Sequence, residues 1–162
     1  MTMTDDPGDA QIPTDALIDH IRTRYHETHR RELPELIALA RKVEAMHAED
    51  IHAPHGLTKA LETIVAELEA HMRAEEAEVF AAFAGDTSAV PNERLGALRD
   101  DHDAQEAALN RIAAITHGLR LPAGACRSWR RLYSGLGKLA EDLDEHRHLE
   151  NHVLFPRLQE PS

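Results

Sequence analysis

Apolar residues recur at steps of three and four along most of this chain, which is the spacing of one face of an α-helix. The clearest stripes are Leu57, Leu61, Ile64 and Leu68; Leu95, Leu98, Leu109 and Ile112; and Trp129, Leu132, Leu136, Leu139 and Leu143. No stretch shows the strict alternation of apolar and polar residues that is typical of a β-strand. The pattern therefore predicts a chain of amphipathic helices.

Prolines and glycines divide the sequence into four long segments. We expect helices over Thr14 to about Ala48, Pro54 to Ala84, Pro91 to about His117, and Ala125 to about Leu158. Thr14 can cap the first helix, and Gly85 and Gly118 are plausible C-terminal caps. Four such helices joined by short loops most simply pack as an all-α, up-down-up-down four-helix bundle.

The length of the chain fits a single domain. A chain of 162 residues can enclose its own hydrophobic core, so we expect residues 14–160 to form the bundle. Residues 1–13 are polar, acidic and broken by prolines, and they lack the basic and apolar regions of a secretory signal. We expect this stretch to be a disordered tail. The longest apolar run, Val79 to Ala84, is far below the ~20 residues of a membrane span.

Composition narrows the range of partners. Apolar residues make up 42% of the chain and aromatic residues only 4%, and the apolar set is mostly Leu, Ala and Ile, which favours helices over strands. The formal net charge of -11 argues against binding to nucleic acid or to an anionic membrane surface, because both require clustered Lys and Arg. The single cysteine, Cys126, cannot form an internal disulfide, which suits the cytoplasm and leaves one thiol of unknown role.

Three His-x-x-x-Glu pairs place a histidine and a glutamate one turn apart on one helix face. They are His71/Glu75, His102/Glu106 and His146/Glu150. The spacing alone is weak evidence, because a chain with 12 histidines produces some of these pairs by chance. The angular position of each residue relative to the apolar stripe, at 100° per residue, is more informative.

By this test, five side chains continue the apolar stripes towards the core: His71 and Glu75 on the second helix, His102 on the third, and His146 and Glu150 on the fourth. Glu106 lies about 70° from the centre of its stripe and is a flanking residue. His148 and His152 fall on the opposite face of the fourth helix. Because buried charges are normally paired or bound to metal, the pattern points to a metal site. The alternative is a set of hydrogen-bonded core histidines with glutamates at solvated seams.

The first helix offers two histidines at the same depth. With a rise of about 1.5 Å per residue on both sides of the loop near His52, His26 and His29 are each roughly level with His71. His47 lies about 21 Å from that level and is excluded. Helical periodicity slightly favours His29, because His26 lies away from the apolar stripe of its helix. Both residues stay open as candidates.

From about Leu17 to Leu158 the chain resembles the hemerythrin-like domain of the iron-sulfur cluster repair di-iron proteins, also called the repair of iron centres family. The matching stretches are LIDHIRTRYHETHRRELPELI at 17–37, LEAHMRAEEAEVF at 68–80, DDHD at 100–103, GACRSWRRLYSGLGKLAEDL at 124–143 and EHRHLENHVLFPR at 145–157. Longer members of that family also carry an N-terminal domain with a vicinal Cys-Cys pair. This sequence contains no such pair, so steps that need those thiols would be absent or supplied in trans.

The resemblance implies a non-haem centre of two iron ions with an oxo bridge. The implied ligands are His26, His71, His102 and His146, with Glu75 and Glu150 bridging the metals. In that family the histidine after Arg-Tyr is the ligand from the first helix, which selects His26 and leaves His29 as the fallback. Glu67 and Asp142 lie one turn before His71 and His146, where each could accept a proton from a ligand imidazole.

The resemblance also implies a stress-response role: protection or repair of iron-sulfur clusters damaged by nitric oxide or oxidants, with the damaged iron-sulfur proteins as partners. The alternative is a hemerythrin-like module that binds or senses dioxygen or nitric oxide. A ferritin-like oxidase would need inward Glu-x-x-His pairs. Glu44/His47 lies at the wrong depth for this and Glu145/His148 faces outward. The patterns leave open whether the protein is an enzyme, which electron donor it uses and its oligomeric state.

Overall fold

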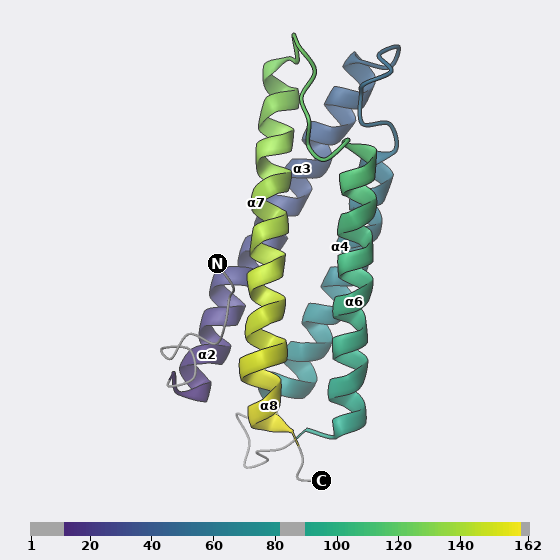
Figure 1. Ribbon diagram of the computed structural model, residues 1–162. Helices are drawn as coiled ribbons and strands as arrows, with labels where there is room; N and C mark the ends of the chain where they lie inside the picture. Colours follow the sequence, from purple (N-terminus) through teal and green to yellow (C-terminus); the bar gives the residue numbers. More distant parts are fainter. Residues whose placement is uncertain (1–11, 82–89, 160–162) are drawn as a thin grey trace.

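The computed structural model describes residues 12–81 and 90–159, which fold into four long helical rods (Figure 1). The rods are built from α2 (Thr14–His20), the π-helical segment η1 (Ile21–His26) and α3 (Glu27–Met46); α4 (Leu57–Ala74) and the π-helical segment η2 (Glu75–Phe80); α6 (Asn92–Ile115); and α7 (Arg127–Leu149), the π-helical segment η3 (Glu150–Leu154) and α8 (Phe155–Leu158). Within the described residues there is no strand, and the predicted all-α four-helix bundle is confirmed.

The first helix starts at Thr14 as predicted, whereas the other three start one to three residues after the predicted Pro54, Pro91 and Ala125. Thr14 is the first helical residue and not a cap, because the chain enters the helix at Pro13 and no side chain caps it. The second rod begins at Leu57, three residues after Pro54, because Gly56 adopts a φ of 91° that only glycine reaches without strain. Gly118 closes the third helix as expected, with its N–H on the carbonyl of Ala113. Gly85 and most of the 1–13 tail lie outside the described residues.

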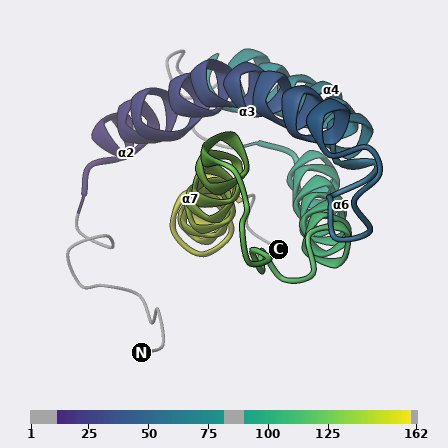
Figure 2. The same cartoon turned by 90° about the horizontal axis from the view of Figure 1, so that it is seen from above.

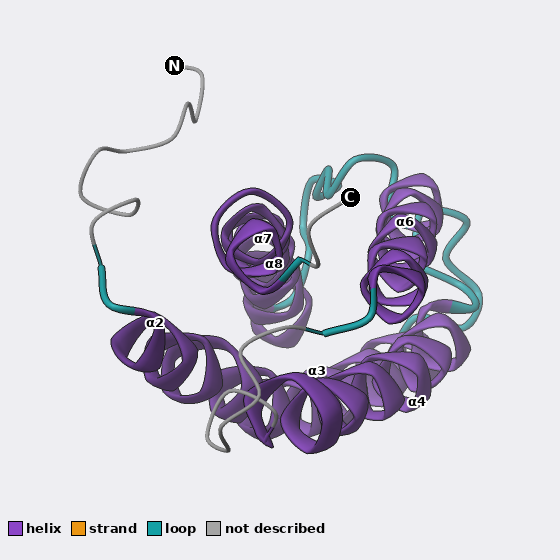
Figure 3. Cartoon of the chain, turned by 90° about the horizontal axis from the view of Figure 1, so that it is seen from below, coloured by secondary structure: helices purple, strands orange, loops and turns teal. Residues whose placement is uncertain are grey.

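The rods alternate in direction, and α3 packs closely against both α4 and α7 while α4 packs closely against α6. Seen from above, α3 and α4 lie along one side of the molecule, and α7 and α6 lie along the other (Figure 2). The view from below shows α8 continuing the α7 rod (Figure 3). The fourth neighbouring pair, α6 with α7, is not among the closely packed pairs.

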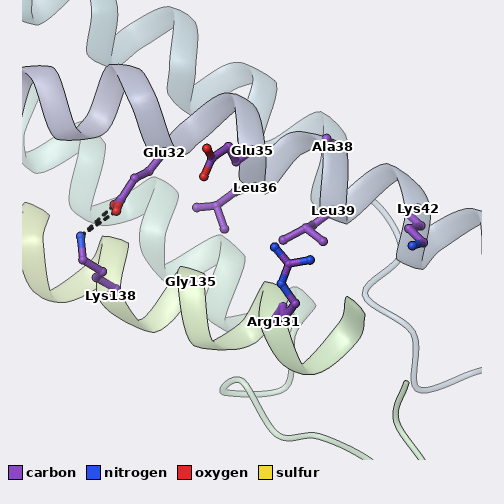
Figure 4. Close-up of a pocket in the computed structure, with 9 residues that line it drawn as sticks. All are labelled: Glu32, Glu35, Leu36, Ala38, Leu39, Lys42, Arg131, Gly135 and Lys138. Atoms are coloured by element: carbon purple, nitrogen blue, oxygen red, sulfur yellow. Dashed lines mark hydrogen bonds and ion pairs between the residues drawn. The ribbon is translucent and has the colours of Figure 1, made fainter. Parts of the chain in front are cut away.

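A glycine allows the first and fourth rods to approach. A Cβ placed on Gly135 of α7 would lie 2.5 Å from Cδ2 of Leu36 on α3, which is closer than two carbon atoms can approach. Figure 4 shows the two residues facing each other along a groove that also carries the ion pair between Lys138 and Glu32, at 2.9 Å. Further along the same two rods, the rings of His29 and His146 stack with their centroids 5.3 Å apart.

The hydrophobic core consists of two clusters with a polar layer between them. One cluster occupies the end of the bundle nearer the α3–α4 loop and includes Leu57, Trp129 and Leu136. The other includes Leu17 and Phe155, at the end nearer the chain termini. The buried histidines and glutamates lie between the two clusters along the rods. Within residues 12–81 and 90–159, no helix is both long and apolar enough to cross a bilayer.

Candidate metal centre

Three of the four rods change helix type at a candidate ligand. η1 ends at His26, η2 begins at Glu75 and η3 begins at Glu150. A π-helical turn is closed by i→i+5 hydrogen bonds and so takes one more residue than an α-turn. Residues five apart, such as Ile21 and His26, therefore share a face inside η1, and both are fully buried. This explains why 100° periodicity turned His26 away from the core.

All six predicted ligands lie together in the polar layer, each with at most 2% of its surface exposed. Their ligand atoms fall into two groups with a shared member: His26, Glu75, His146 and Glu150 in one group, and His71, His102 and Glu150 in the other. Within each group the atoms lie within 4.8 Å of one another. The four rods thus bring imidazoles and carboxylates together at one height, with a donor set that suits iron and other divalent transition metals.

Glu150 stands between two histidines. Its Oε1 lies 2.7 Å from Nε2 of His102, and its Oε2 lies 2.8 Å from Nε2 of His146. The two carboxylate oxygens therefore face imidazoles that belong to different groups of ligand atoms. A single carboxylate thus contacts both groups of ligand atoms.

Glu75 occupies the corresponding position between the first and second rods. Its Oε1 lies 3.3 Å from Nε2 of His26 and 3.1 Å from Nε2 of His71. Neither oxygen of Glu75 has a hydrogen-bond partner among the described residues, nor has Nε2 of His26. The charge of a buried carboxylate without hydrogen bonds needs an adjacent cation, which here is either a protonated His26 or His71 or a bound metal ion. The residues present therefore fit a metal centre.

The Nδ1 atom of each of the four candidate ligand histidines faces away from the buried carboxylates and has a hydrogen-bond partner. The contacts are His26 to Glu76 at 2.9 Å, His71 to Asp101 at 2.9 Å, His102 to Asn151 at 2.8 Å and His146 to Nε2 of His29 at 3.2 Å. Each partner belongs to the next rod around the bundle, and the fourth rod closes the ring on the first. Partners of this kind fix the orientation of an imidazole and leave its Nε2 for a metal.

Sequence reasoning missed three of these four partners and considered the fourth, His29, only as a possible ligand. Glu76, Asp101 and Asn151 are each the immediate sequence neighbour of a predicted ligand, which is a signal that could have identified them. Glu67 and Asp142 were wrong as partners. Glu67 is exposed, and Asp142 binds Arg24 and Lys138.

Two further histidines, His29 and His47, do not contact the buried carboxylates. His29 is fully buried, but its Nε2 contacts His146 and not the carboxylates. His47, which depth excluded, lies at the end of α3 with its Nε2 3.2 Å from Sγ of Cys126. Glu106 is exposed and lies 3.8 Å from Arg147, which agrees with its predicted place on the flank of the third helix. The role of Cys126 stays open.

We expect Asp101→Ala to weaken Fe²⁺ binding by about 10- to 100-fold, because His71 would lose the carboxylate that orients it. Glu67→Ala is the matched control, since it removes the carboxylate that helical spacing had assigned to the same histidine. Titration with Fe²⁺ under anaerobic conditions measures both affinities. Equal affinities for the two variants would contradict the assignment of Asp101.

The protonation of the histidines depends on the carboxylates around them. Burial alone would lower the pKa of His26 and His71, but the adjacent Glu150 and Glu75 outweigh it and raise the pKa to about 10 and about 11. Burial, together with the charges of His146 and His26, lowers the pKa of His29 to about 3. With no metal bound, His26 and His71 therefore carry protons at neutral pH, and His29 is neutral.

Metal binding at neutral pH is accordingly expected to release about two protons per chain, one each from His26 and His71, because a metal ion needs the deprotonated Nε2. The affinity for the metal ion should increase as the pH rises from about 6.5 towards the raised pKa values. The increase should be up to about tenfold per released proton for each pH unit. Calorimetry in buffers of different ionisation enthalpy counts the released protons. Uptake of protons, or affinity independent of pH, would contradict this.

Comparison with known proteins gives a consistent result. Residues 17–158, which include all six candidate ligands, match the family model described as the hemerythrin HHE cation binding domain. The iron-sulfur cluster repair protein YtfE of Pectobacterium carotovorum is 39% identical over 155 residues, which cover 93% of this chain and 70% of that protein. The probable iron-sulfur cluster repair protein of Haemophilus influenzae is 41% identical over 142 residues, covering 88% and 64%. This chain therefore spans about two thirds of the length of these relatives.

Proposed function

The chain belongs to the hemerythrin HHE cation-binding domain family, and on that premise we propose that it is a non-haem di-iron protein that protects or repairs iron-sulfur clusters under nitrosative or oxidative stress. Relatives that are 38% to 41% identical are named iron-sulfur cluster repair proteins, which supports the repair role. Damaged iron-sulfur proteins are the partners that this role implies.

The position of Glu150 is the observation that carries the proposal of two ions. One of its oxygens faces the imidazole of His102 and the other faces that of His146, so a single carboxylate serves both groups of ligand atoms. We assign His26 and His146 to one iron and His71 and His102 to the other. Glu75 and Glu150 would be the carboxylates that serve both ions.

Two iron ions held in this way would supply electron-transfer chemistry and coordination positions for a small ligand such as nitric oxide or dioxygen. The protein contributes a buried surrounding, since each of the six candidate ligands is at most 2% exposed. Aromatic rings lie against three of the imidazoles: Tyr25 on His146 at 5.2 Å between centroids, Phe80 on His26 at 5.6 Å and Phe155 on His102 at 5.8 Å. These rings cover one side of each imidazole and restrict the orientation of its plane.

A hemerythrin-like module for binding or sensing dioxygen or nitric oxide is the alternative function. Hemerythrin has a fifth inward histidine, and His29 is the residue of this chain that could take that part. Its Nε2 is engaged with Nδ1 of His146, away from Glu75 and Glu150. This disposition favours the four-histidine repair type of centre.

Iron content and reactivity test the proposal. We expect the native protein to contain about two irons per chain, with the near-ultraviolet charge-transfer bands of an oxo-bridged pair. Anaerobic incubation with a nitric-oxide-damaged [4Fe–4S] enzyme should restore the activity of that enzyme, and the Glu150→Ala variant is the matched control. A colourless, iron-free protein would contradict the di-iron centre. A loaded protein that forms a stable coloured dioxygen adduct and restores nothing would favour the alternative.

A further inference from the structure

A polar pocket opens on the surface between α6 and the rod formed by α7 and η3, next to the centre. We call it the seam pocket; its volume is about 190 Å³, and its outer lining includes Asp103 on α6 and Asp144, His148 and His152 on the opposite rod. The inner wall is formed by His102 and Asn151. The seam pocket thus reaches from the surface to one of the candidate iron ligands.

This side of the bundle is the least closely packed of the four. α6 and α7 are the neighbouring helices that do not pack closely. The inner wall is closed by the hydrogen bond from Nδ1 of His102 to Oδ1 of Asn151, at 2.8 Å. That bond involves a neutral amide, whereas His26 and His71 are held by carboxylates, whose charge makes the hydrogen bonds stronger.

The outer lining has the chemistry of a cation site. The rings of His148 and His152, four residues apart on the outer face of the rod, have centroids 5.0 Å apart. A pair of imidazoles at this spacing suits divalent transition metals. Asp103, Asp144 and Glu106 line the same pocket, together with Arg147, which contacts Asp144 at 3.3 Å and Glu106 at 3.8 Å. The excess of negative charge attracts cations.

We propose that His148 and His152 bind a divalent transition-metal ion in the seam pocket, and that iron passes through this pocket, beside His102, on its way to and from the buried centre. The proposal rests on the di-iron function proposed above. It gives a role to two histidines that face away from the core and that the centre itself does not use. A protein that repairs iron-sulfur clusters needs a route of this kind if its iron exchanges with solution.

Zn²⁺ is a redox-inert probe for the first part of the proposal. We expect the iron-loaded wild-type protein to bind about one additional Zn²⁺ without losing iron, and the His148→Ala/His152→Ala variant to bind it at least about tenfold more weakly. His52→Ala/His117→Asn is the matched control, because it removes two exposed histidines that line a different pocket. The His148→Asn/His152→Asn variant serves as a second test in case the alanine variant does not fold. Far-ultraviolet circular dichroism shows whether both variants keep their helical structure.

The rate of iron release tests the second part. A chromophoric Fe²⁺ chelator added to the reduced protein should remove iron about tenfold more slowly from the His148→Ala/His152→Ala variant than from wild type or control. Wild-type protein that binds no additional Zn²⁺, a variant that still binds it, or an unchanged release rate would each overturn the proposal. Iron content measured in the same samples separates this outcome from a failure of the di-iron function, in which the wild type would hold no iron.

Discussion

Glu150→Ala is expected to abolish stable iron binding, with the affinity falling by more than about a hundredfold, which exceeds the usual effect of removing a residue that only orients a ligand. The reason is that the two oxygens of Glu150 face imidazoles from both groups of ligand atoms, so one substitution removes a ligand from each proposed iron. Iron per chain after anaerobic loading and desalting measures the effect. Glu75→Ala should also lower the iron content.

Two comparisons make this result specific. Glu150→Gln keeps one carbonyl oxygen, so it should retain at most about one iron per chain. Glu141→Ala removes an exposed glutamate from the same helix and should retain about two. If Glu150→Ala purified with the full iron content of the Glu141 control, the shared-carboxylate arrangement would be wrong.

His26→Ala should also lower iron to about one per chain or less, because it deletes a proposed ligand whose Nε2 faces Glu75. His29→Ala should keep about two irons and weaken their binding by about 10- to 100-fold, because His29 only orients His146. Iron titrations of both variants resolve the choice that helical periodicity left open. His29→Gln should restore part of the affinity, since its amide oxygen can accept the same Nδ1–H bond.

The reverse order of effects would identify His29 as the ligand. In that case His29→Ala would lose iron, His26→Ala would keep it, and the glutamine variant would restore nothing. Equal and complete loss in both variants, with helical circular dichroism retained, would mean that both histidines bind metal and would favour the five-histidine arrangement of hemerythrin itself.

The sequence predicted the bundle and the convergence of most of the site because both depend on periodicity within one helix. Leu68, His71 and Glu75 lie at spacings of three and four, so their common face could be derived without knowledge of any neighbour. The same holds for Leu143, His146 and Glu150. These spacings fixed the direction of the side chains, and the similar distances from the connecting loops fixed their height.

The parts that could not be derived depend on packing between helices. His26 points to the core because of the π-helical turn Ile21–His26, which changes the angular position of every residue after it relative to a regular α-helix. The partners of the imidazoles come from adjacent rods, whereas Glu67 and Asp142 were chosen from the same rods as the histidines. The relative rotation and offset of two rods depend on contacts such as that between Gly135 and Leu36, which a single-helix pattern does not contain.

The polar layer between the two hydrophobic clusters has a consequence for cooperativity. We expect each cluster to have its own free energy of unfolding. In the apoprotein, the layer that joins the clusters is held by protonated imidazoles and buried carboxylates rather than by apolar packing. Iron would act as a cross-link between four rods at this junction. The apoprotein should therefore melt in two calorimetric transitions, and the loaded protein in a single one at higher temperature.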